Sequence, residues 1–341
     1  MADFVTNWLT RHCDYDPSTD IPDQTGRVFV ITGGHSGIGY ECTKQLLAHG
    51  ATVYMTGRSP AQAAAAIEQL EEELPHIYGR GRVRFLKVDM SNIHDVQRAA
   101  ESFMARVSRL DVLVHNEGRA PDQYEMSKEG VELSIAVNHL GIAVLTDTLM
   151  PLLKETASRS NTDVRVVVVS SRAHMCRPRK CMLSNLEEWN QYGGARGDST
   201  VARQSRFGMT RYMNLLWVQQ LQKVLDAQGI PVTALALHPG PSIVTSFSTS
   251  HQLPNWISHS MKAAGLSADK ASYTTLFAAT SPDVRCQRET YKGGYLEPFG
   301  KPRQPRVKDA GDTERAEALW RATEKVMMEI LSRPPDGWQM L

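Results

Sequence analysis

Three closely spaced glycines, Gly33, Gly37 and Gly39, are the first residues in the chain whose spacing suggests chemistry. They follow the apolar run VFVIT and precede a helical pattern, so they occupy a strand-to-helix turn. A turn without bulky side chains lets the backbone approach a pyrophosphate closely, and the helix N-terminus offers free N–H groups to its oxygens. The spacing G-x-x-x-G-x-G at this place therefore predicts a dinucleotide-binding turn.

A cation stands where the second predicted strand ends. Proteins that select NAD usually have a carboxylate at this place for the ribose hydroxyls, but here the sequence reads Gly57-Arg58. A guanidinium can form two hydrogen bonds to a 2′-phosphate, and His35 and Ser36 lie on the neighbouring turn. Arg58 therefore favours NADP over NAD, the alternative being an ordinary surface arginine.

Short β-branched runs alternate with helical patterns from residue 27 onward. The predicted strands are 27–32, 51–56, 83–88, 111–115, 164–170 and 231–238. The predicted helices include 37–50, one capped by Ser59 with Pro60 at its first position, and one whose apolar face is Leu133, Val137, Leu140 and Val144. Apolar strands separated by helices indicate an α/β fold with a parallel sheet covered on both faces.

One domain with additions at both ends fits this pattern best. The expected parts are an N-terminal extension (1–26), the main domain (27–300) and a C-terminal tail (301–341) with a helix at roughly 313–332. After residue 245 the chain becomes polar, aromatic and irregular, which predicts a lid over a cleft at about 246–262. Phe247, Trp256 and Met261 in that lid point to a small apolar substrate.

The composition is that of an ordinary globular protein. The 341 residues carry a net charge of +1 without a block of like charges, which argues against nucleic-acid or polybasic membrane binding. No apolar run approaches the roughly 18 residues of a membrane span. The five cysteines are odd in number and form no CxxC pair, so we expect reduced thiols, a cytoplasmic protein and no metal.

Several motifs in a fixed order give the chain a resemblance to a known family. They are TGGHSGIG (32–39), VDMS (88–91), LDVLVHNEG (110–118), VNHLG (137–141), VVVVSSRAH (166–174) and LHPGPSIVTSF (237–247). The chain resembles a short-chain dehydrogenase/reductase, nearest to retinol-dehydrogenase-like members of fungal secondary metabolism. The resemblance implies a doubly wound Rossmann sheet of about seven strands.

The resemblance also implies roles for individual residues in cofactor binding. Asp89 would hold the adenine edge, Asn116 would fix the cofactor ribose and the central strand, and Pro239 to Thr245 would contact the nicotinamide. The expected cofactor-binding residues are Gly33, His35, Ser36, Gly37, Ile38, Gly39, Arg58, Asp89, Asn116, Arg211, Pro239, Gly240 and Thr245. Glu117 departs from the family pattern, which has a small residue there, and either repels the cofactor, serves as an acid or base, or turns outward.

The family transfers a hydride between a nicotinamide and a carbonyl or alcohol carbon, and two of its catalytic residues are matched. Ser171 matches the serine that polarises the substrate oxygen, with Ser170 as the less favoured neighbour. Asn138 matches the asparagine that holds a proton-relay water.

The family's Tyr-x-x-x-Lys motif is altered. In RFGMTRYMN (206–214) the tyrosine and lysine positions hold Phe207 and Arg211. Phenylalanine cannot transfer a proton, a loss worth roughly 10²–10⁴ in rate. Arg211 can keep the cation and the ribose contacts of the lysine. The Tyr192/Arg196 pair has the right spacing but lies in a glycine-rich stretch.

The sequence therefore predicts an NADP(H)-dependent oxidoreductase with a substitute proton donor, namely Tyr192, His174, Glu117 or a relay water. Two alternatives stay open: a non-redox catalyst of cyclisation, isomerisation or dehydration, and a catalytically silent cofactor-binding partner. We expect a small-molecule substrate and no nucleic acid, with a homo-oligomer or a pathway-enzyme partner left open.

Overall fold

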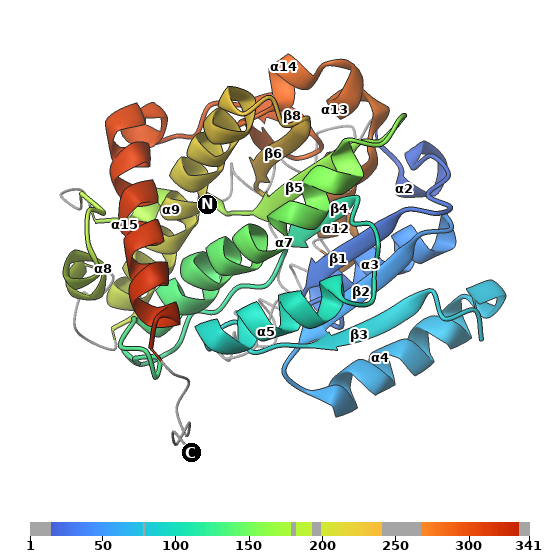
Figure 1. The fold of residues 1–341 in the computed structure, drawn as a ribbon, viewed down its shortest axis with the longest axis horizontal. Helices are drawn as coiled ribbons and strands as arrows, with labels where there is room; N and C mark the ends of the chain where they lie inside the picture. Colours follow the sequence, from blue (N-terminus) through green and yellow to red (C-terminus); the bar gives the residue numbers. More distant parts are fainter. Residues whose placement is uncertain (1–14, 78, 179–181, 193–198, 241–266, 334–341) are drawn as a thin grey trace, which may run out of the picture.

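In the computed structural model, which describes residues 15–77, 79–178, 182–192, 199–240 and 267–333, eight strands form one sheet (Figure 1). The strand order is β3-β2-β1-β4-β5-β6-β7-β8. The strands are β1 Val28–Thr32, β2 Thr52–Gly57, β3 Val83–Lys87, β4 Val112–His115, β5 Val164–Val169, β6 Val232–Leu237, β7 Tyr295–Glu297 and β8 Lys301–Arg303. All neighbours pair in parallel except β7 and β8.

The α/β class and the six predicted strands are confirmed, while the expected number of about seven strands is too low by one. The additional strand is β8, which pairs antiparallel with β7 in a segment that we predicted as tail. Its sequence, Lys-Pro-Arg, is exposed at all three positions and has no apolar pattern to reveal it. Gly300, at φ 73°, makes the reversal between the two strands.

The helices begin and end close to their predicted bounds. The longer helices are α3 Gly37–Ala48, α4 Pro60–Glu73, α5 Ile93–Met104, α7 Gly141–Ala157, α9 Thr200–Ala227, α12 Ala268–Thr280 and α15 Thr313–Leu331. The short ones are α2 Pro17–Asp20, η1 Pro75–Ile77, α6 Leu133–Ile135, η2 Ala136–Leu140, η3 Arg172–Cys176, α8 Leu186–Tyr192, α13 Pro282–Cys286, α14 Arg288–Tyr291 and η4 Lys308–Gly311. As expected, the Ser59 hydroxyl caps α4 by accepting from the Gln62 N–H at 3.3 Å.

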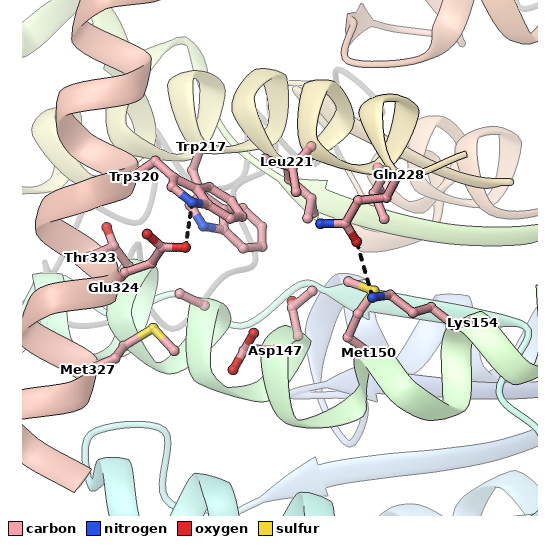
Figure 2. A pocket seen from close by; sticks show the side chains of 14 residues that line it. Asp147, Met150, Lys154, Trp217, Leu221, Gln228, Trp320, Thr323, Glu324 and Met327 are labelled. Atoms are coloured by element: carbon pink, nitrogen blue, oxygen red, sulfur yellow. Dashed lines mark hydrogen bonds between the residues drawn. The ribbon is translucent and has the colours of Figure 1, made fainter. Parts of the chain in front are cut away.

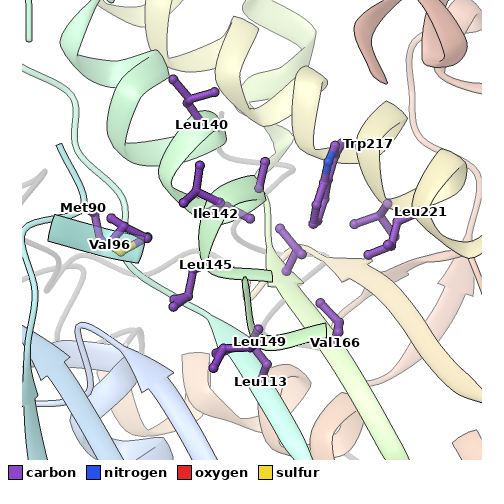
Figure 3. Close-up of a cluster of buried hydrophobic side chains, with 14 of the residues drawn as sticks. Met90, Val96, Leu113, Leu140, Ile142, Leu145, Leu149, Val166, Trp217 and Leu221 are labelled. Carbon is purple, nitrogen blue, oxygen red and sulfur yellow. The ribbon is translucent and has the colours of Figure 1, made fainter. Parts of the chain in front are cut away.

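Two apolar layers cover the sheet, as the strand pattern predicts. Val166 and Val168 of β5 belong to the layer that contains α5, α7 and α9, whereas Val167 and Val169 belong to the layer that contains α3, α4 and α12. Figure 3 shows the first of these layers, where Trp217 of α9 stands beside side chains of α7. The C-terminal helix α15 packs against α9. At this contact Trp320 of α15 stacks on Trp217 of α9, with ring centroids 6.2 Å apart.

The most apolar helical stretch lies inside this packing. Leu133–Ala157, which contains α6, η2 and α7, is long and apolar enough to cross a membrane by length and composition. However, 83% of its most apolar window is buried in the fold, as expected for a core helix. We therefore assign it to the core that positions the site.

Candidate cofactor and active site

The turn between β1 and α3 has the geometry that its glycines predict. Gly33 and Gly37 have φ angles of 64° and 54°, which side chains disfavour. A Cβ atom on Gly39 would overlap the Gly33 carbonyl oxygen and lie 2.7 Å from Asn116 Nδ2. The turn, the first residues of α3 and the end of β4 are thus in close backbone contact, which leaves a cradle that only glycine permits.

The N-terminus of α3 is open toward this cradle. Ser36 is the N-cap residue, but its side chain makes no capping hydrogen bond. The N–H groups of Gly37, Ile38 and Gly39 therefore remain free within the helix, at the positive end of a 12-residue dipole. This arrangement suits the phosphates of a dinucleotide.

At the end of β2, the His35 ring folds back over the strand. Its Nδ1 donates to the Thr56 carbonyl oxygen at 3.2 Å, and a Cβ on Gly57 would come within 2.7 Å of its Cε1. The next residue, Arg58, is exposed and has no hydrogen bond or ion pair with the described residues. An uncommitted cation therefore stands beside the phosphate cradle.

Asp89 and Asn116 are held by their own neighbours. Asp89 Oδ1 accepts from Ser91 N at 3.0 Å and from Ser91 Oγ at 2.7 Å. Asn116 Nδ2 donates to the Thr32 carbonyl at 3.0 Å, and its backbone N–H donates to Thr32 Oγ1 at 2.9 Å. Asn116 thus ties the end of β4 to the end of β1, and its role toward a cofactor ribose stays a prediction.

Glu117 turns into the cradle, so the outward orientation that we left open does not occur. Its backbone N–H donates to Thr32 Oγ1 at 3.0 Å, and its Cβ lies 3.4 Å from where a Cβ of Gly33 would be. One carboxylate oxygen is buried without a hydrogen-bond partner. Burial raises the pKa of this carboxyl to about 7, against the opposing effect of Arg58.

Asn138 lies in η2, a π-helical turn between α6 and α7. Its side-chain oxygen accepts from Arg119 N at 2.7 Å, and its Nδ2 donates to the Arg119 carbonyl at 2.7 Å and to Thr210 Oγ1 at 3.1 Å. With its amide rotated to satisfy its neighbours, Asn214 donates to the Asn138 carbonyl at 2.8 Å. Asn138 therefore connects the loop after β4 to α9, and its relay-water role remains a prediction.

The two serines at the end of β5 differ in burial and in hydrogen bonding. Ser170 is buried, and its hydroxyl donates to the Arg211 carbonyl at 2.9 Å. Ser171 is half-buried, and its hydroxyl oxygen accepts from Ala173 N at 3.2 Å, where it caps η3. Because this bond uses only a lone pair, the Ser171 proton is left to donate to a substrate oxygen.

Helix α9 packs directly on η3, which places its motif beside Ser171. A Cβ on Gly208 would overlap the Ala173 carbonyl oxygen, so only glycine permits this contact. Arg211 follows Phe207 by about one helical turn, and its Cζ lies 4.6 Å from the Phe207 ring centroid. Arg211 Nη1 donates to the Val169 carbonyl at 3.0 Å.

The Arg211 guanidinium is buried and poorly satisfied. Its Nε has no hydrogen-bond partner, its Nη2 fills the space where a Cβ of Gly118 would be, and no carboxylate among the described residues pairs with it. Burial lowers its pKa to about 10, so it stays charged at neutral pH. A guanidinium with an unsatisfied donor fits the ribose hydroxyls of a nicotinamide cofactor, as the glycine cradle fits its phosphates.

Several expected site residues fall at the boundary of the described residues. Pro239 and Gly240 follow β6 after His238. Thr245 and the predicted lid at 246–262 lie outside the described part of the chain. Tyr192 is the last residue of α8, so it ends a helix rather than standing in the glycine-rich stretch, and Arg196 lies outside the described residues.

The comparisons with known proteins agree with this geometry. A family model described as short chain dehydrogenase matches residues 27–182. The short chain dehydrogenase/reductase dpchH of Colletotrichum higginsianum is 37% identical over 313 residues, covering 91% of this chain and 77% of that protein. The chain belongs to the short-chain dehydrogenase/reductase family. A second member, dpfgH of Gibberella zeae, is 30% identical over 94% of this chain and 87% of its own length.

Solved structures support the same fold for this short-chain dehydrogenase/reductase. An uncharacterized protein from Mycobacterium paratuberculosis superimposes with a TM-score of 0.68 at 28% identity, covering 92% of this chain and 97% of that one. RhlG of Pseudomonas aeruginosa, in complex with NADP, has a TM-score of 0.58 at 20% identity, with coverage of 81% and 96%. The Rossmann-type sheet is thus confirmed.

Our reading of the sequence missed a buried polar cluster at the ends of β5, β6 and β7. His174 Nδ1 donates to the Ser171 carbonyl at 2.6 Å, and its ring meets Tyr295 edge-on with centroids 5.7 Å apart. His174 Nε2, His238 Nδ1 and Tyr295 OH are buried without hydrogen-bond partners. Nothing in the sequence brings Tyr295 to the two histidines, because only the pairing of β6 with β7 does so.

The structure also has a cavity that is separate from the cofactor cradle. Its volume is about 190 Å³, and it opens between α7, α9 and α15 (Figure 2). Asp147, Lys154, Trp217 and Trp320 line it, with Lys154 donating to Gln228 at 3.3 Å. No group of three metal-ligating side chains occurs among the described residues.

Proposed function

We propose that this protein is an NADP(H)-dependent oxidoreductase that acts on a carbonyl or alcohol of a small apolar molecule. The observation that carries the cofactor choice is Arg58, an exposed cation at the end of β2 that pairs with none of the described residues, where a carboxylate would select NAD. The apolar substrate follows from the predicted lid residues Phe247, Trp256 and Met261. The similarity of this chain to fungal short-chain dehydrogenases/reductases supports a role in secondary metabolism.

The residues around Ser171 can hold and polarise a substrate oxygen. A bound nicotinamide supplies or accepts the hydride. Ser171 donates its hydroxyl hydrogen to the substrate oxygen, and the Arg211 guanidinium, whose Nε has no hydrogen-bond partner among the described residues, holds the ribose hydroxyls. Asn138 keeps the loop after β4 in place against α9. This set orients the reacting groups without a strong acid.

The proton donor has to be a substitute because Phe207 has no ionisable group. We infer that the proton comes from solvent water through the Ser171 hydroxyl, with a slower chemical step than a phenol would allow. Tyr192, His174 and Glu117 remain as other donors. Among these, His174 is fully buried with Nδ1 bound to the Ser171 carbonyl, so it would act only through Ser171.

A non-redox reaction is the second candidate, and the Phe207–Arg211 stack favours it. The pair presents a buried cation over an aromatic ring where the family has its proton donor. Such a site could stabilise negative charge that develops on a substrate oxygen during isomerisation, cyclisation or dehydration. In that case the nicotinamide would be a structural element.

The cofactor assignment is tested by titrating the protein with NADPH and NADH and following cofactor fluorescence. We expect tighter binding of NADPH, and we expect Arg58→Ala to weaken NADPH by about tenfold to a hundredfold because one charged hydrogen-bonded pair is lost. NADH should be unaffected. Arg321→Ala, on the exposed face of α15, is the matched control. Equal affinity for both cofactors in the wild type would contradict the NADP assignment.

The reaction class is tested by incubating the protein with NADPH and a panel of apolar ketones. Consumption of NADPH together with an alcohol product supports the oxidoreductase. A converted substrate with unchanged NADPH would instead support the non-redox candidate.

The described cysteines agree with the expected cytoplasmic location, which we retain as a proposal. Cys42, Cys176 and Cys286 are free thiols, with Cys42 buried. Cytoplasmic proteins keep thiols in this reduced state.

A further inference from the structure

Glu117 occupies the crevice where the strand order of the sheet reverses. The chain runs from β1 outward to β2 and β3, and then returns to β4 on the other side of β1. Ligands of open α/β sheets bind in this crevice, beyond the carboxyl ends of the strands. Glu117 follows β4, and the glycine turn that begins at Gly33 follows β1. Its side chain therefore stands where a dinucleotide would pass.

The protein leaves part of this carboxyl unsatisfied. The backbone N–H of the residue donates to Thr32 Oγ1, and its Cβ lies on the side of Gly33, 3.4 Å from where a Cβ of that glycine would be. One side-chain oxygen is buried and has no hydrogen-bond partner among the described residues. A buried polar atom without a partner costs free energy, and the cost is removed when a ligand provides the partner.

Three charged groups surround the carboxyl, and none of them forms an ion pair with it. Arg58 approaches from the end of β2, Asp89 from the segment after β3, and Arg119 from its own loop. Arg119 already pairs with Glu125 at 3.7 Å. The two arginines favour the anion, whereas burial, Asp89 and the phosphates of a bound cofactor favour the neutral acid.

We propose that Glu117 is a cofactor ligand that works as the neutral acid and donates its hydroxyl hydrogen to an oxygen of the bound dinucleotide. The inference rests on the proposed nicotinamide site. Binding above neutral pH would then take up one proton from solution, and no covalent bond would form or break. The ionised side chain would repel the cofactor, so affinity falls as the pH rises.

The acidity of the group agrees with this role. Burial raises the pKa of Glu117 to about 7, with Asp89 raising it further and the two arginines lowering it. Below that pH the acid is neutral and the affinity is full. Above it, each pH unit of ionisation reduces the affinity by up to about tenfold.

The test is the dissociation constant of NADPH and of NADH as a function of pH, measured by cofactor fluorescence. In the wild type we expect both constants to rise by up to about thirtyfold between about pH 6 and about pH 8.5. NADH is included because it lacks the 2′-phosphate, whose own ionisation near pH 6 would otherwise contribute to the slope. In Glu117→Gln, which keeps a hydrogen-bond donor but cannot ionise, the NADH constant should stay flat, and the NADPH constant should keep only the slope that comes from its 2′-phosphate.

Calorimetry gives a second readout that a merely structural role would not change. Titrations in two buffers with different ionisation enthalpies should show uptake of about half a proton per bound cofactor near the pKa of Glu117 and nearly one proton at higher pH. The uptake should vanish in Glu117→Gln. Glu125→Gln, in the same loop, is the matched control and should keep the wild-type slope and uptake.

The outcomes separate the two proposals. If neither cofactor binds at any pH, the proposed function fails and this inference fails with it. If the cofactors bind with a flat profile in the wild type, or with an unchanged slope in Glu117→Gln, the nicotinamide site stands and the role of Glu117 is refuted.

Discussion

Replacing Arg211 by methionine should stabilise the free protein, although Arg211 belongs to the candidate site. The guanidinium is buried and donates a hydrogen bond to the Val169 carbonyl. Among the described residues it has no carboxylate partner. A buried charge without a counter-ion is usually destabilising, and an apolar side chain of similar length removes that cost. Binding and stability therefore oppose each other at this position.

The magnitude follows from the Arg211 contacts. Burial lowers its pKa well below the usual value of arginine, to about 10, which corresponds to about 3 kcal/mol against the charged form. The hydrogen bond to Val169 offsets about 1 kcal/mol of this. The stack on Phe207 offsets about 1 kcal/mol more. We therefore expect Arg211→Met to raise the free energy of unfolding by about 1 kcal/mol.

Arg206 on the same helix is the matched control. It is equally buried, but it lies 3.8 Å from the buried carboxylate of Glu132. Arg206→Met would leave that carboxylate without its partner, so we expect a loss of about 3–5 kcal/mol. Urea unfolding of the two variants without cofactor measures both values. If Arg211→Met destabilises the protein as much as Arg206→Met does, the assignment of Arg211 as an uncompensated charge is wrong.

Two further changes probe the site. Phe207→Tyr/Arg211→Lys should raise the rate of carbonyl reduction by roughly 10²-fold or more if only a proton donor is missing; an unchanged rate in the NADPH oxidation assay would point to a non-redox reaction. Gly39→Ala should abolish NADPH binding in the fluorescence titration because the added Cβ overlaps the Gly33 carbonyl oxygen, whereas Gly311→Ala, with nothing within 4 Å, should bind normally.

Local patterns predicted the elements that carry a strong local signal. The apolar run of β1, the glycines after it and the Ser59–Pro60 start of α4 each encode their structure within a few neighbouring residues. β8 escaped prediction because Lys301–Arg303 has no apolar alternation, and only pairing with β7 defines it as a strand. The π-helical turn at Ala136–Leu140 likewise has no sequence signal that we recognise.

The site was predictable in its residue types and much less so in its contacts. The sequence identified Arg211 as a cation in the motif. That its Nη2 fills the space where a Cβ of Gly118 would be depends on how α9 packs against the loop after β4. The inward turn of Glu117 depends in the same way on its contact with Gly33. Both are contacts between segments far apart in the chain, which a single sequence does not encode in a readable form.

The exposed edge strand β8 has a consequence for how this protein behaves at high concentration. An edge strand with free N–H and C=O groups can add a strand from another molecule and start aggregation. Here Pro302 has no N–H to offer, and Lys301 and Arg303 place a positive charge on each side of it. Sheet extension through this edge is therefore blocked, and of the two edges of the described sheet only β3 is left for pairing with a strand of another molecule.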